Sequence, residues 1–137
     1  MSNPVPSLSA ILICEKVIEE VGTRKKTLVG IFDNVQAQAL PIGLPLGIYA
    51  RLADGEGEYS LLVRISTTDA DGNEIRVFEG TMQGSVPSRL QAFEIAINFL
   101  YLQFDRPGRY DIQIHADGVY VGHASFNVSV APQQEGL

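Results

Sequence analysis

Apolar and polar residues alternate with a period of two along much of this chain of 137 residues. The two clearest runs are residues 59–66 and 93–99. Their alternating apolar residues are Tyr59, Leu61, Val63 and Ile65 in the first run and Phe93, Ile95, Ile97 and Phe99 in the second. Successive side chains of a β-strand point to opposite faces, so this period predicts strands with one buried face.

Segments rich in Gly, Pro, Asp and Asn separate the strand-like runs at intervals of about 8–12 residues, which suits strands and is too short for most helices. Residues 8–21 also fit a helix, but residues 27–35 resemble a hairpin partner and favour a strand. The pattern predicts an all-β fold: a single antiparallel β-sandwich of about seven to nine strands, immunoglobulin-like, over residues 5–131. The polar residues 132–137 are expected to form a frayed tail.

The last two predicted strands can be joined in two ways. A two-residue turn would put polar residues of the final strand on the buried face unless a bulge intervenes. A three-residue turn at 116–118 pairs Ile114 with Tyr120 and Tyr110 with Ala124, and it keeps the apolar residues on one face. We therefore predict the three-residue turn.

Both histidines of the chain, His115 and His123, then fall on the solvent face of this hairpin, with His123 opposite Asp111. They stand too far apart along the hairpin to share a metal ion. No nucleophile or second ligand lies near them in the sequence. We interpret them as surface histidines without a catalytic role.

The net charge of −6 argues against nucleic acid and anionic membrane surfaces as partners. No apolar run approaches the length of about 20 residues that a membrane span needs. The single cysteine, Cys14, cannot build a disulfide framework, which suits a reducing compartment. No Lys or Arg precedes the short apolar run near the N-terminus, so a signal peptide is not expected. These features predict a cytoplasmic protein.

The turn at residues 69–74, DADGNE, has some of the carboxylates of a calcium loop, but an EF-hand loop is longer and lies between helices. Strand order would place this turn at the same end of the sandwich as residues 36–45 and the loop around Asp105. Asp69, Asp71 and Asp105 could then converge. Ordinary turn chemistry accounts for the same residues, so we expect no metal site and keep a calcium-dependent binding domain as an alternative.

The opposite end should gather basic and acidic residues that neutralise each other. They are Arg24, Lys25, Lys26 and Arg89 on one side and Asp54, Glu56, Glu58 and Asp117 on the other. No nucleophile elbow or phosphate-binding motif occurs, and Cys14 lies in an apolar strand where a thiol behaves as a buried hydrophobe. We therefore expect no catalytic residue and no cofactor. A hydrolase or sugar-processing enzyme with carboxylates on loops is the alternative class.

The most unusual apolar segment is ALPIGLPLG, in which Leu40, Ile42, Leu44 and Leu46 alternate with small or rigid residues. It fits an edge segment that covers the sandwich or an exposed docking strip. We predict these four residues as the contact for a protein partner. The predicted function is a non-catalytic binding or protein-interaction module.

Exposed edge strands invite pairing with another chain. The predicted edges are residues 8–17, 40–49 and 75–84. Prolines protect the second edge and glycines can kink the third, whereas no charge or proline occurs from Leu8 to Cys14. We expect the first strand to be covered by the chain's own loops or paired in a homodimer, with the dimer favoured, and Ile11→Lys to test that contact.

Several segments resemble a bacterial family of short proteins catalogued as a domain of unknown function. They are ILICEKV, TLVGIFDNV, LPLGIYARLADGEGEYSLLVRI and FDRPGRYDIQI, the last followed by DG. The C-terminal part is also similar to bacterial immunoglobulin-like domains. The resemblance extends from about Leu8 to Val130, implies a β-sandwich and carries no catalytic residues.

Overall fold

The computed structural model describes residues 3–132, which form nine β-strands and no helix. The strands are β1 (Ser7–Glu19), β2 (Lys26–Ile31), β3 (Asn34–Ala37), β4 (Ile42–Ala53), β5 (Gly57–Thr68), β6 (Glu74–Val86), β7 (Phe93–Phe104), β8 (Gly108–Ala116) and β9 (Val119–Val130). They build one sheet in the order β2-β1-β4-β7 and a second in the order β3-β9-β8-β5-β6. The predicted all-β sandwich of seven to nine strands is confirmed. Most of the predicted frayed tail, residues 133–137, lies outside the described residues.

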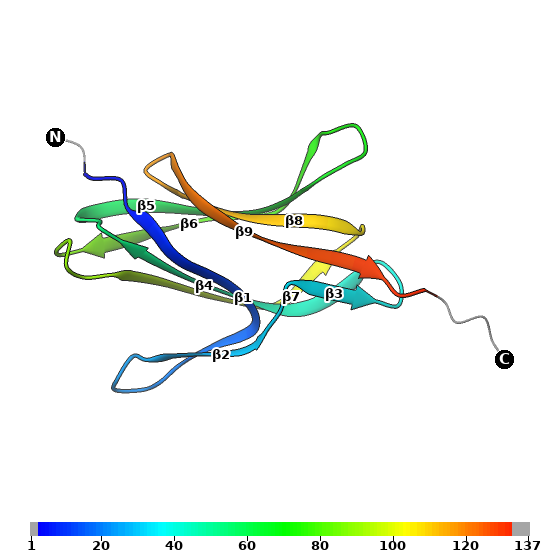
Figure 1. Cartoon of the computed structure of the whole chain (residues 1–137), viewed down its shortest axis with the longest axis horizontal. Helices are drawn as coiled ribbons and strands as arrows, with labels where there is room; N and C mark the ends of the chain where they lie inside the picture. The colour runs from blue at the N-terminus through cyan, green and yellow to red at the C-terminus, as the bar shows by residue number, and fades with distance from the viewer. Residues whose placement is uncertain (1–2, 133–137) are drawn as a thin grey trace.

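The two sheets form two layers, with β5, β6, β8 and β9 above β4, β1 and β7 in Figure 1. The core between them is built by the alternating apolar residues. Its largest fully buried side chains include Tyr110, Phe104, Phe126, Leu46, Ile48, Leu61, Ile65, Ile95, Ile112 and Ile114. Burial of each such side chain stabilises the fold by about 1.5–3 kcal/mol, so the strands settle with their apolar faces inward. The described residues form no helix long and apolar enough to cross a membrane.

One strand pair departs from the predicted antiparallel arrangement. β3 pairs with β9 in parallel, with Asn34 beside Asn127. The chain leaves β2 in the first sheet and reaches the edge of the second sheet after Phe32 and Asp33. The segment continues in one direction through this crossing (Figure 1), so β3 arrives parallel to β9.

The turn between β8 and β9 has two residues, and the predicted three-residue turn is wrong. The observed partners are Ala116 with Val119, Ile114 with Gly122 and Tyr110 with Phe126, in place of Ile114 with Tyr120 and Tyr110 with Ala124. A bulge shifts the register between Ile114 and His115. The bulge returns the apolar residues of β9 to the core, which removes the reason for a longer turn.

The second half of β1 folds with β2 as a hairpin over the outer face of β4 and β7, and this hairpin projects below the lower layer in Figure 1. Gly47 permits the close crossing, because a Cβ atom there would lie 3.0 Å from Cys14 Sγ and 3.1 Å from Val17 N. Asn98 of β7 fastens the hairpin. Its Oδ1 accepts a hydrogen bond from Val17 N at 2.8 Å, and its Nδ2 donates to Val17 O at 2.8 Å. Burial under the hairpin raises the pKa of the Cys14 thiol.

Of the three predicted edge strands, residues 75–84, in β6, lie at a sheet edge, and residues 8–13 of β1 form an edge beside β4 because β2 does not reach them. The segment 40–49 leads into β4, which lies between β1 and β7. In the segment 8–17 of β1, only residues 14–17 pair with β2. The sequence could not place these strands, because sheet order depends on which distant strand pairs with each of them.

Candidate binding groove

A short crossing segment joins the two sheets at one side of the sandwich. Phe32 N donates a hydrogen bond to Ile13 O of β1 at 3.0 Å, and Asn127 N of β9 donates to Asp33 O at 2.9 Å. Phe32 also packs edge-on against the core ring of Phe126, with ring centroids 6.0 Å apart. These contacts fix the crossing to both layers.

Beside this crossing, each sheet contains one strand that has neighbours on both sides over only part of its length. We call such a strand half-open. β2 pairs with β1 only from Cys14 to Glu19, so residues 7–13 of β1 pair with β4 alone. β3 pairs with β9 only from Asn127 to Val130, so residues 119–126 pair with β8 alone. Backbone donors and acceptors on the unpaired side of a strand can bind a further strand.

A hollow of about 370 Å³ lies between these two half-open strands. Its walls are Ile11, Leu12, Ile13, Ile31, Phe32, Asp33, Ala124 and Ser125. Beyond it, the Leu8 side chain of β1 packs directly on Gly122 of β9, where a Cβ atom would collide with it. Leu12 and Ile31 remain exposed, by 38% and 58%. We call this hollow the groove.

A second hollow, of about 310 Å³, lies on the other side of Phe32. Its walls are Glu15, Phe32, Asn34, Val35, Ile42, Leu44 and Pro45. Two of the four predicted contact residues, Ile42 and Leu44, thus line a surface hollow. Leu46 is fully buried in the core, and Leu40 is partly buried against it. The predicted strip is therefore only partly accessible.

The two hollows have an acidic lining. Asp33 and Glu15 are the charged residues among their walls, and no Lys or Arg joins them. Within the described part of the chain, no ion pair involves Asp33 or Glu15. The ion pairs are Lys26 with Glu19 and Glu94, Arg64 with Glu74 and Glu79, Arg76 with Glu79, and Arg109 with Asp111.

The turn at residues 69–74 uses its first carboxylate for the backbone. Asp69 Oδ1 accepts hydrogen bonds from Asp71 N at 2.9 Å and Asn73 N at 2.8 Å. The Asn73 N–H donor is the main reason that the pKa of Asp69 is lowered. The described residues contain no group of three or more His, Cys, Asp or Glu that could hold a metal ion. Asp69, Asp71 and Asp105 therefore do not form the calcium cluster that we considered.

The opposite end of the sandwich contains the expected turns but not the expected ion pairs. Lys26 contacts Glu19 at 3.3 Å and Glu94 at 3.6 Å. Asp117 accepts a hydrogen bond from Ser60 N instead of meeting a cation. The pairing differs from the prediction because the hairpin turns Lys26 toward the outer face of β7, where Glu94 lies.

The histidines lie on the outer face of the second sheet. His123 pairs with Gln113 and not with Asp111, whose partner is Ser125. The bulge in β9 brings Tyr120 beside both rings: its hydroxyl contacts His123 Nδ1, and its ring lies edge-on to His115. The two histidines and Tyr120 thus contact one another, and none of them lines either of the two hollows described above.

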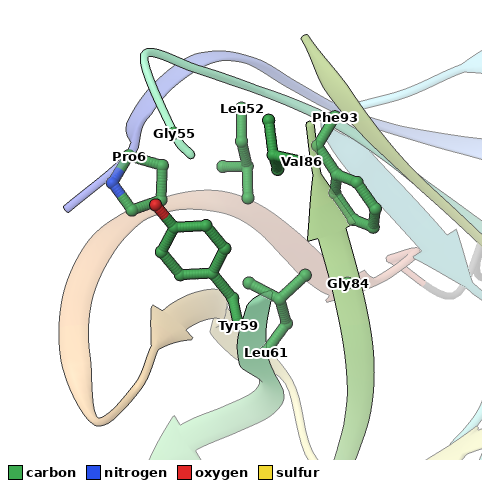
Figure 2. A pocket seen from close by; sticks show the side chains of 8 residues that line it. All are labelled: Pro6, Leu52, Gly55, Tyr59, Leu61, Gly84, Val86 and Phe93. Carbon is green, nitrogen blue, oxygen red and sulfur yellow. The ribbon is translucent and has the colours of Figure 1, made fainter. Parts of the chain in front are cut away.

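A further hollow lies between the sheets near the start of β1 (Figure 2). It is lined by Pro6, Leu52, Gly55, Tyr59, Leu61, Gly84, Val86 and Phe93. Its volume of about 10 Å³ is the size of one water molecule, so it is a packing gap and not a ligand site. Tyr59 closes it, with its hydroxyl donating to Pro4 O at 2.6 Å.

Three groove residues, Leu12, Phe32 and Asp33, were not predicted from the sequence. Phe32 and Asp33 interrupt the predicted strand at 27–35, and a polar break inside an apolar run is the local sign of a strand that changes sheets. Leu12 carried no such sign, because its exposure depends on where β2 stops.

Comparison with solved structures found weak overall likenesses. A CARDB domain of a Pyrococcus furiosus protein, crystallised with di-metal ions, is 18% identical with a TM-score of 0.44, covering 96% of this chain and 93% of that chain. An alkylpurine DNA glycosylase of Pseudomonas fluorescens, bound to DNA with an abasic site analogue, is 12% identical with a TM-score of 0.36, covering 87% of this chain and 30% of its own. A β-glucosidase of Listeria innocua in complex with isofagomine is 6% identical with a TM-score of 0.42, covering 90% of this chain and 16% of its own.

A search of curated proteins found no match. A family model does match residues 9–129, which include all of the groove and nearly all of both sheets. The chain belongs to the family of unknown function DUF6941.

Proposed function

We propose that this protein is a non-catalytic cytoplasmic interaction module that binds an extended segment of a protein partner in the groove. The observation that supports this proposal is the meeting of two half-open strands, residues 7–13 and 119–126, beside an apolar hollow. Main-chain hydrogen bonds to an open strand supply affinity, and a side-chain pocket supplies specificity.

The chemistry of the groove fits binding better than catalysis. Its walls are mostly aliphatic, and Asp33 is the one carboxylate among them. The hydroxyl of the wall residue Ser125 is held on the outer face of the second sheet, where it donates to Asp111 Oδ1 at 2.6 Å and accepts from Arg109 Nη2 at 2.9 Å. Cytoplasmic location rests on the free, buried thiol of Cys14, which suits a reducing compartment.

Site-specific photo-crosslinking in the source cells tests the proposal. A photoreactive residue replaces Leu12 in the groove or, as a matched control, Leu100, which is 93% exposed on β7. We expect position 12 to capture a defined protein and position 100 not to capture it.

The same partner should be lost from co-purification with Leu12→Arg, by about tenfold or more, because a buried apolar contact becomes a charge. Leu100→Arg should retain it. Capture from position 100 alone, or equal loss with both arginine variants, would exclude the groove as the binding site.

A further inference from the structure

The position beside residues 7–12 of β1 is the place where the first sheet lacks a strand. β2 runs antiparallel to β1 and ends with Ile31 opposite Cys14. Phe32 N makes one more hydrogen bond, to Ile13 O, and the chain then leaves for the second sheet. A strand of about six residues, about 20 Å long, would continue the line of β2 along β1.

The charge of the groove restricts what such a strand can carry. Asp33 lies at the end of the groove where β2 leaves β1, and Glu15 lies beyond it on the far side of Phe32. Neither carboxylate belongs to an ion pair within the described chain. The other walls are apolar or neutral. A cation at this end and apolar residues along the rest would complement the lining.

We propose that the groove binds an extended segment of another protein that begins with Lys or Arg and continues with alternating apolar residues, added antiparallel to β1 in line with β2. This inference rests on the proposed function and specifies its partner. The direction follows from β2: a strand in line with it starts beside Leu12, after Phe32 and next to Asp33, and runs toward Ser7. Its first residue therefore meets the carboxylate.

A second copy of this chain fits the groove less well. The unpaired stretch of β1, residues 7–13, contains no Lys or Arg that could meet Asp33. Each copy also carries a net charge of −6, so two copies repel each other before contact. The charge complementarity thus favours a basic partner of different sequence.

Titration of the isotope-labelled full chain with two synthetic peptides tests this proposal by NMR. The probes are acetyl-Lys-Val-Thr-Val-Thr-Val-amide and the same peptide with Glu in place of Lys. We expect the Lys peptide to bind with a dissociation constant of about 1 mM or below and to shift the amide signals of residues 11–13 and 124–125. The Glu peptide should bind more weakly, by about fivefold or more.

Asp33→Asn should weaken binding of the Lys peptide by about two- to fivefold, the range for a partly exposed ion pair, and should leave the Glu peptide unweakened. Asp71→Asn, the same change in the exposed β5–β6 turn, should have no effect. Added salt should reduce the preference for Lys, since it screens exposed charges.

Three results overturn the proposal. Equal affinity for both peptides would exclude the charge complementarity. If neither peptide binds while position 12 still captures a partner in cells, a partner segment that begins with Lys or Arg is excluded and the proposed function is retained. Cross-linking of position 12 to a second copy of this chain would assign the groove to self-association.

Discussion

Tyr110 combines core packing with a backbone hydrogen bond. It is 1% exposed and packs against Phe104 and Phe126, with ring centroids 4.9 Å and 5.5 Å away. Its hydroxyl donates to Arg106 O at 2.6 Å, four positions upstream in the loop before β8. This arrangement resembles the tyrosine corner of immunoglobulin-type sandwiches. Burial raises the pKa of the Tyr110 phenol.

The raised pKa gives a pH dependence with a definite sign. The unfolded chain loses the phenolic proton near pH 10, whereas the folded chain retains it to higher pH. The contribution to stability is therefore complete below about pH 10 and is lost as the pH rises through the folded-state value. We expect Tyr110→Phe to lose about 1 kcal/mol of unfolding free energy at pH 7, with the hydrogen bond, and to reduce the alkaline loss. Urea unfolding at pH 7 and above pH 10 measures both effects.

Tyr101→Phe is the matched control, since Tyr101 is 66% exposed on β7. It should have the same unfolding free energy at pH 7 as the unaltered chain and the same decrease in unfolding free energy above pH 10. If the unfolding free energy of Tyr110→Phe decreases above pH 10 as much as that of Tyr101→Phe, the Tyr110 phenol is not the source of the pH dependence.

At the scale of elements, the β1–β2 hairpin is attached to β7 by the hydrogen bonds of Asn98 and by the ion pair of Lys26 with Glu94. Asn98 bonds both the N–H and the C=O of Val17, and Gly47 provides the space beneath. The hairpin also fixes how far β2 covers β1, and so where the open stretch of β1 begins. Attachment of the hairpin and the shape of the groove are therefore linked.

Asn98→Ala should release the hairpin without unfolding the sandwich. Two hydrogen bonds are lost, so we expect a decrease of about 1–3 kcal/mol in unfolding free energy. Hydrogen exchange should accelerate in residues 15–31 and stay slow in β5 and β8. Asn127→Ala, an exposed asparagine on β9, should leave exchange in residues 15–31 unchanged. Uniform acceleration across both sheets with Asn98→Ala would show that the hairpin is not a separate unit.

At the scale of the whole molecule, the sequence predicts self-association through β1, whereas the acidic groove favours a monomer, and the structure identifies the variant that distinguishes the two. Ile11 packs against the core, so Ile11→Lys would disturb folding as well as any contact between copies. Leu12 is the exposed large apolar residue of the same stretch. Leu12→Lys is therefore the variant that reports on association.

The acidic groove leads us to expect a monomer from light scattering at micromolar concentration and low salt, both for the unaltered chain and for Leu12→Lys. A dimer that Leu12→Lys converts to monomers would instead support the symmetric pairing that the charge-free stretch of β1 suggested. A dimer that persists in Leu12→Lys and is lost with Leu100→Lys would place the contact on β7.

The sequence alone determined the strands and most of the core. In β5 and β7 the period of two fixed which residues face inward, because successive side chains on a strand must point to opposite sides. The turn at residues 69–74 was equally legible, since Asp69 bonds backbone groups only two and four positions away. The sequence also predicted Ile42 and Leu44 as accessible contact residues, and both line a hollow. These features depend on neighbours in the chain.

Only the tertiary structure decided the sheet order, the parallel β3–β9 pair, the bulge in β9 and the groove. Cys14 meets Gly47, Val17 meets Asn98, and Phe32 connects Ile13 with the second sheet, all across long separations in sequence. Leu12 is exposed and Leu46 is buried although both lie in apolar runs, because β2 stops short of one while both sheets enclose the other. Local pattern sets which face of a strand is apolar; packing between distant strands sets which apolar faces and edges remain open.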